Sequence, residues 1–195
     1  MAKNASTAAE WDAEYRKGRW DFLGSLTESG RSGILASWLA ETGTHTSILD
    51  VGCGEGVFYR HIAPLKPEHY VGIDLSPESF TKSGIDPAPG RFEAADLHTF
   101  EPQPGETFSA VVFNEVLHFC EDPAAQFERY KAFLRPGGVI AVSMYAPNRP
   151  DSGANRIIKR LWDATDGADW EVLDDLSLTS GAKNVTWKLR LVRPV

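Results

Sequence analysis

The stretch Ser47-Ile-Leu-Asp-Val-Gly-Cys-Gly-Glu-Gly56 joins a short apolar run to three glycines at alternate positions. The apolar residues predict a buried strand, and a helical pattern follows at Val57, Phe58, His61 and Ile62. Strand, glycine turn and helix in this order open a nucleotide-binding βαβ unit. Glycine permits positive φ in such a turn and lets a ligand approach the backbone closely.

Two features separate this turn from the dinucleotide fingerprint. Val57 stands where G-x-G-x-x-G requires its third glycine. Asp50, at the end of the strand, would repel a pyrophosphate but attract an ammonium group. A nucleoside that carries an amino acid, such as S-adenosylmethionine, therefore suits the turn better than NAD does. A nicotinamide-dependent oxidoreductase is the disfavoured alternative.

The chain resembles the class I S-adenosylmethionine-dependent methyltransferases over roughly residues 10 to 194. The glycine turn is similar to motif I of that family, and four further matches follow in the family's order. They are Val71-Gly-Ile-Asp-Leu-Ser76, Ala95-Asp-Leu97, Val111-Val-Phe-Asn-Glu-Val-Leu-His118 and Leu134-Arg-Pro-Gly-Gly138. Five such motifs in order are far more specific than one.

Cofactor-binding residues are expected at successive strand ends. Asp74 lies 24 positions after Asp50, where an acid accepts hydrogen bonds from ribose hydroxyls. The resemblance implies that Asp96 accepts from the adenine amino group and that the Leu97 amide donates to the ring. Asn114 ends a central strand and faces the methyl donor, because ligands bind at the carboxyl ends of parallel strands. The remaining expected cofactor contacts are Gly52, Cys53, Gly54 and Leu75.

The fold class predicted is α/β, a Rossmann-like doubly wound sheet that is mostly parallel. Strands are expected at residues 48–51, 69–74, 91–96, 108–113, 139–145, 169–179 and 185–192. The last two are joined only by Ser180-Gly-Ala-Lys-Asn184, too short for a parallel crossover, so the last strand must be reversed. The Gly- and Pro-rich segment 82–90 and the segment 99–107 read as connecting loops, and Arg135-Pro-Gly-Gly138 as the stop of a helix.

Composition bounds the class of protein. A chain of 195 residues predicts a single domain, with a tail and lid helices over 1–43, of which 1–9 form the tail, and a core over 44–195. A net charge of -7 argues against a nucleic-acid partner. Two cysteines without C-x-x-C spacing, and no membrane-length apolar run, indicate a cytoplasmic protein that does not enter a membrane. We expect a monomer or a homodimer.

The aromatic residues of the N-terminal segment have two interpretations. Trp11, Tyr15 and Trp20 either form a lid over the cofactor cleft or pack on the helical layer of the sheet. The resemblance favours the lid, because small-molecule methyltransferases often close the site with N-terminal helices. Tyr15, Trp20 and Tyr145 are the expected acceptor-binding residues.

The chemistry expected is in-line transfer of a methyl group to an oxygen or nitrogen of a small-molecule acceptor. His118 is the candidate general base on pKa grounds, although a surface or core histidine at the start of a helix is at least as good an interpretation. Glu115 is the second catalytic candidate, with a structural role or contact with the methionine portion as alternatives. No metal is expected. The alternative function is a methyltransferase-like protein that binds the cofactor without turnover.

Overall fold

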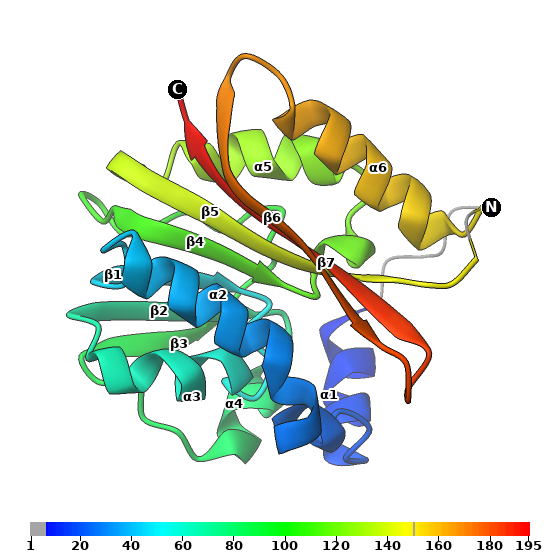
Figure 1. Ribbon diagram of the computed structural model, residues 1–195. Helices are drawn as coiled ribbons and strands as arrows, with labels where there is room; N and C mark the ends of the chain where they lie inside the picture. Colours follow the sequence, from blue (N-terminus) through cyan, green and yellow to red (C-terminus); the bar gives the residue numbers. More distant parts are fainter. Residues whose placement is uncertain (1–6, 150) are drawn as a thin grey trace.

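A computed structural model describes residues 7–149 and 151–195. Its strands form one seven-stranded sheet in the order β3-β2-β1-β4-β5-β7-β6 (Figure 1). Their bounds are β1 Ser47–Val51, β2 His69–Asp74, β3 Gly90–Ala94, β4 Phe108–Asn114, β5 Leu134–Ala146, β6 Trp170–Ser180 and β7 Val185–Pro194. Strands β1 to β5 are parallel, and β7 lies antiparallel to both β5 and β6. The predicted doubly wound sheet with a reversed last strand is confirmed.

Helices cover both faces of this sheet. Their bounds are α1 Ala8–Arg16, α2 Ser29–Glu41, α3 Val57–Ile62, α4 Pro77–Ser83, α5 Pro123–Lys131 and α6 Gly153–Thr165. Short 3₁₀ segments are η1 Asp21–Gly24, η2 Leu26–Glu28, η3 Ala63–Leu65 and η4 Leu117–Phe119. Because side chains alternate along a strand, Ile48 faces the layer of α2 and α3, whereas Leu49 faces that of α5 and α6.

The two N-terminal helices occupy different positions. Leu35 and Leu39 of α2 are fully buried against the sheet, so α2 belongs to a covering layer and is not a lid. Helix α1, by contrast, packs beside α4, near the end of the sheet that also holds the β6–β7 turn (Figure 1). A capping box between Thr7 and Glu10 begins α1. Of these two helices, α1 is therefore the one whose position is compatible with the predicted lid.

Several predicted boundaries differ from the structure. Helix α1 starts at Ala8, within the expected tail of 1–9, whose first six residues lie outside the described part. Helix α4 continues to Ser83, into the expected loop, and the third strand ends at Ala94 rather than at Asp96. Arg135-Pro-Gly-Gly138 forms the irregular start of β5, and α5 has already ended at Lys131.

Phe100 departs from the expectation of an exposed 99–107 loop. Its side chain is only 4% exposed and packs in the core edge-on to Phe133. The sequence did not predict this burial, because a single apolar residue among polar and proline residues produces no periodic pattern.

Candidate active site

The glycine turn follows β1 at the carboxyl edge of the sheet and is tied to the neighbouring strand. The amides of Gly52 and Cys53 both donate to the Ile73 carbonyl of β2. Gly52 and Gly54 have φ of 70° and 53°, in the left-handed region that favours glycine. A Cβ at Gly52 would lie 2.4 Å from a methyl of Val116, so only glycine fits there. Cys53 is buried, and burial raises the pKa of its thiol. The thiol therefore stays protonated and packs as a small side chain.

Asp50 lies buried beneath this turn. Its carboxylate is 1% exposed, and Oδ2 accepts a 2.5 Å hydrogen bond from the Tyr70 hydroxyl. Oδ1 is buried without a hydrogen-bond partner among the described residues. Burial raises the pKa of Asp50 to about 7. A buried acceptor left free at this place is suited to a donor that a ligand brings, and an ammonium is such a donor.

Asp74 ends β2 and holds the turn through backbone hydrogen bonds. Oδ2 accepts from the Gly54 amide at 3.0 Å, and Oδ1 accepts from the Ser76 amide at 2.9 Å. Burial raises the pKa of Asp74 to about 6, and these backbone donors oppose that shift. Each carboxylate oxygen can accept more than one hydrogen bond, so the predicted ribose contact remains open to Asp74.

Helix α1 contacts both the segment that follows β2 and helix α4. The Ser76 hydroxyl donates to Asp12 of α1, and Lys82 of α4 donates to the Tyr15 carbonyl. A Cβ at Gly54 would lie 3.1 Å from the Tyr15 hydroxyl oxygen, which places the phenol against the glycine turn. The expected contact of Tyr15 with the acceptor stays a prediction, while its hydroxyl lies beside the turn where the cofactor is expected to bind.

The predicted adenine contacts lie in the short segment after β3. Asp96 Oδ1 accepts from the His98 amide at 2.8 Å, which forms a local turn. The Leu97 carbonyl accepts from the Tyr130 hydroxyl at 2.9 Å, so α5 fixes this segment. Leu75, between Asp74 and Ser76, is partly exposed. The fold thus brings Leu75, Asp96 and Leu97 to the carboxyl edge, each one to three residues past the end of its strand.

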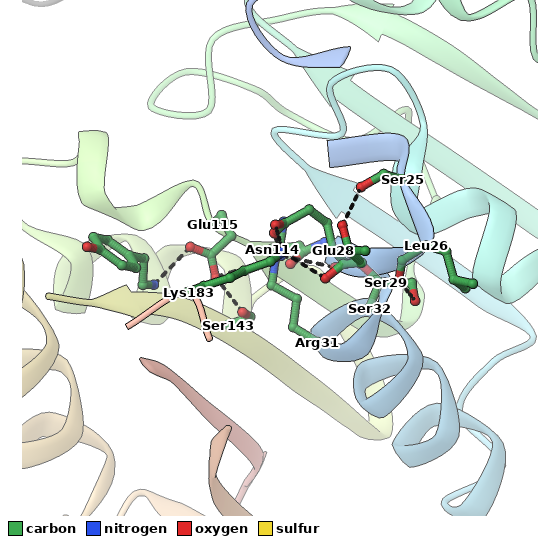
Figure 2. Close-up of polar contacts among 12 residues, drawn as sticks. Ser25, Leu26, Glu28, Ser29, Arg31, Ser32, Asn114, Glu115, Ser143 and Lys183 are labelled. Carbon is green, nitrogen blue, oxygen red and sulfur yellow. Dashed lines mark hydrogen bonds and ion pairs between the residues drawn. The ribbon is translucent and has the colours of Figure 1, made fainter. Parts of the chain in front are cut away.

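Asn114, the last residue of β4, and Glu115, which follows it, take part in a polar network that joins three elements (Figure 2). Asn114 Nδ2 donates to the Ser32 hydroxyl of α2 at 3.1 Å, and its Oδ1 is buried without a partner among the described residues. Glu115 accepts from the Ser143 hydroxyl at 2.5 Å and from the Tyr145 amide at 2.8 Å. Its φ of 66° is strained for a non-glycine residue. These contacts favour the structural alternative for Glu115 over direct catalysis.

His118 lies in η4, immediately after β4. Both ring nitrogens are buried and neither has a hydrogen-bond partner in the described part of the chain. Burial lowers the pKa of the imidazole, so the ring is neutral near pH 7. A neutral imidazole with a free nitrogen is able to accept a proton, which keeps His118 as the candidate base.

An aromatic row follows from η4 to η1. Trp11 of α1 contacts Phe119 edge-on at 5.0 Å between ring centroids and lies 5.9 Å from Trp20. The indole nitrogen of Trp20 is buried without a partner among residues 7–149 and 151–195. Tyr145 is 38% exposed at the end of β5. Trp20 and Tyr145 therefore remain candidates for contact with an acceptor.

Sequence reasoning missed a group of charged residues beside this network. Arg31 of α2 and Lys183 of the β6–β7 turn both contact the Glu28 carboxylate (Figure 2). Arg31 Nε also lies 3.9 Å from Glu115 Oε1. Arg31 falls within a helix, and Lys183 within a turn far along the chain, so neither formed a motif in the sequence.

Neither a membrane-crossing helix nor a metal-binding cluster is found among the described residues. Among them no helix has both the length and the apolar character that crossing a membrane requires. In the same residues, no three histidine, cysteine or acidic side chains are grouped as ligands of a metal ion would be.

Comparison with known proteins gives partial matches along the chain. Over 120 residues the chain is 32% identical to phosphoethanolamine N-methyltransferase of Triticum aestivum, which covers 58% of this chain and 23% of that relative. The chain thus spans about a quarter of the length of the curated relatives that it matches first.

Solved structures share the fold at low sequence identity. The N-methyltransferase NodS from Bradyrhizobium japonicum, in complex with S-adenosyl-L-homocysteine, superposes with a TM-score of 0.71 at 20% identity, over 90% of this chain and 91% of NodS. The [4+2]-cyclase SpnF gives a TM-score of 0.65 at 18% identity, over 83% of this chain and 80% of SpnF. A family model described as a methyltransferase domain matches residues 14–176, and with most of the chain inside that match, the protein belongs to this methyltransferase family.

Proposed function

We propose that the protein transfers a methyl group from S-adenosylmethionine to an oxygen or nitrogen atom of a small-molecule acceptor. The observation that carries the proposal is a set of buried polar groups near the carboxyl edge of the sheet that have no hydrogen-bond partner among the described residues. They are Asp50 Oδ1, Asn114 Oδ1, both nitrogens of His118 and Trp20 Nε1. Buried polar atoms are normally hydrogen-bonded, so this cluster marks a place that a ligand completes.

The residues present fit the cofactor. The left-handed glycines form a turn without side chains against which a nucleoside can lie, and the Tyr15 hydroxyl covers it from α1. Asp50 offers a free acceptor to an ammonium, and Asp74 offers lone pairs to ribose hydroxyls. When bound, S-adenosylmethionine supplies a methyl group already activated by a positive sulfur.

The chain's own contribution is alignment and exclusion of water. The covering α1 and the aromatic row of Trp11, Trp20 and Phe119 close one side of the cleft. Glu115 holds the ends of β4 and β5 together through Ser143 and Tyr145, which fixes the floor beside Asn114. Alignment of this kind supplies up to about 7–11 kcal/mol of a displacement barrier. His118 accepts the proton of an acceptor hydroxyl or ammonium.

Incorporation of labelled methyl groups tests the proposal. The purified protein is incubated with methyl-labelled S-adenosylmethionine and a panel of small alcohols, phenols, amines and carboxylic acids. We expect label in at least one acceptor, loss of that label in Asp74→Ala, and no loss in Asp169→Ala, an exposed acid at the opposite edge of the sheet. Tight cofactor binding without label in any acceptor would instead favour the cofactor-binding protein without turnover.

A further inference from the structure

A pocket of about 280 Å³ lies between the N-terminal turn of α2 and the β6–β7 hairpin. Its walls combine segments that are far apart in sequence, from Leu26 to Arg31 on one side and Leu178, Ser180, Lys183 and Trp187 on the other. The pocket adjoins the methyl-transfer end of the site, because Ser32, next to Arg31, bonds to Asn114. Its size suits one polar group of a small molecule rather than a whole cofactor.

Arg31 lines this pocket and has a hydrogen-bond donor without an acceptor among the described residues. Its side chain is 4% exposed and stacks over the Trp187 ring at 5.5 Å. Nη1 donates to the Glu28 carbonyl and carboxylate, whereas Nε is buried with no acceptor among the described residues. Glu115 Oε1, at 3.9 Å, is too far from Nε for a hydrogen bond. A buried guanidinium donor left free next to a pocket is suited to an incoming oxyanion.

The surroundings of Arg31 also favour an anion. Glu28 is occupied on both oxygens, Oε2 by Arg31 and Oε1 by Lys183, which contacts it from the opposite wall (Figure 2). No side chain caps the N-terminus of α2, and its first turn contains no acidic residue. The positive end of that helix therefore adds to the charges of Arg31 and Lys183. Glu28 offsets one of these two charges, which leaves one net positive charge beside the pocket. Glu115 is the other acid nearby, and burial raises its pKa, which favours its neutral form.

We propose that the acceptor carries a carboxylate or phosphate group, and that Arg31 and Lys183 bind this oxyanion in the pocket at the N-terminus of α2. The inference rests on the proposed function, since it assigns the pocket to the methyl acceptor. With its oxyanion held there, the acceptor's oxygen or nitrogen extends past Arg31 toward Asn114 and the methyl donor. The proposal names Arg31 and Lys183 as specificity-determining residues.

The indole NMR signals of the six tryptophans test this assignment. The protein, with and without S-adenosylhomocysteine, is titrated with inorganic phosphate and separately with succinate, against sodium chloride at matched ionic strength. A Trp187→Phe variant identifies the reporter signal. We expect the Trp187 signal to move saturably with phosphate or succinate, and not with chloride. The tighter of the two probes tells which oxyanion the pocket prefers.

Variants separate this site from surface charge. Lys183→Gln, at an exposed turn, is expected to weaken probe binding about tenfold, and Arg31→Gln by at least as much. Arg31→Lys, which keeps the charge but not the fork, should be intermediate. Arg160→Gln, on the exposed side of α6, should match wild type.

An unmoved Trp187 signal, an equal response to chloride, or unchanged affinity in Lys183→Gln would overturn the proposal. If Arg31→Gln fails to fold, Lys183→Gln decides alone. The titration without S-adenosylhomocysteine separates anion binding at this pocket from cofactor binding at the glycine turn. Failure of the cofactor to bind would contradict the proposed function, whereas failure of the anion to bind would contradict only this inference.

Discussion

Asp50 is a carboxyl group that the fold holds in its interior. Its pKa in the folded protein is about 7, above the ordinary value of 3.8, because burial disfavours the charged form. The native state therefore binds a proton that the unfolded chain has lost, and the free energy of unfolding falls as the pH rises from about 4 to about 7. The Tyr70 hydrogen bond moderates this loss without removing it.

Asp50→Asn is expected to flatten that dependence, because a neutral amide still accepts from Tyr70 and does not titrate. The slope that remains should end near pH 6, the pKa of Asp74. Urea unfolding between pH 4 and pH 8 measures the pH dependence of the free energy of unfolding in wild type and in Asp50→Asn. Parallel curves for the two proteins would show that Asp50 does not titrate in this range.

The cofactor should respond to the same titration. If the free Oδ1 of Asp50 binds the ammonium of the cofactor, only the ionised carboxylate does so well. Affinity for S-adenosylhomocysteine should then rise with pH up to about 7 in wild type and vary less in Asp50→Asn. Calorimetry at pH 5.5, 6.5 and 7.5 makes the comparison. The same rise in both proteins would exclude Asp50 as the partner of the ammonium.

His118 has a separate prediction, because its neutral ring suits a base. Once an acceptor is found, His118→Ala should lower turnover by about 10²–10⁴-fold while the affinity for S-adenosylhomocysteine stays near that of wild type. His98→Ala, an exposed histidine of the loop after β3, is the matched control. Undiminished turnover in His118→Ala would leave the histidine with a packing role only.

At the scale of elements, α1 is held over the glycine turn by few contacts. Asp12 accepts from the Ser76 hydroxyl, and Lys82 binds the C-terminal end of the helix. Asp12 also accepts from the Glu78 amide, so Asp12→Ala removes both hydrogen bonds. Their combined loss, about 1 kcal/mol, should make S-adenosylhomocysteine dissociate about fivefold faster. Stopped-flow dissociation measures the rate, with Asp163→Ala on α6 as control. Equal rates in both variants would show that α1 does not retain the ligand.

The sheet was largely predictable, because most strands have an apolar run or an apolar–polar alternation and most connections contain a glycine or proline. The position of Asp50, Asp74 and Asn114 was also predictable, because the carboxyl ends of parallel strands meet at one edge of the sheet. The pocket did not follow, because Glu28 and Lys183 meet only through the β6–β7 hairpin. Nor did the Tyr70 partner of Asp50, which depends on packing between neighbouring strands.

At the scale of the whole molecule, net charge and local charge differ. The chain carries -7 overall, yet the pocket at the N-terminus of α2 gathers Arg31 and Lys183 around the Glu28 carboxylate. The fold alone does not decide the reaction, since a cyclase shares it with an N-methyltransferase. Function therefore rests on the residues at the carboxyl edge, and first on the ligand that they bind.

Calorimetric titration with S-adenosylmethionine, S-adenosylhomocysteine and NAD tests this central claim most directly. We expect the first two to bind with micromolar affinity and NAD not to bind, because Asp50 repels a pyrophosphate and Val57 replaces the third glycine of the dinucleotide turn. Binding of NAD, or of neither adenosyl compound, would contradict it.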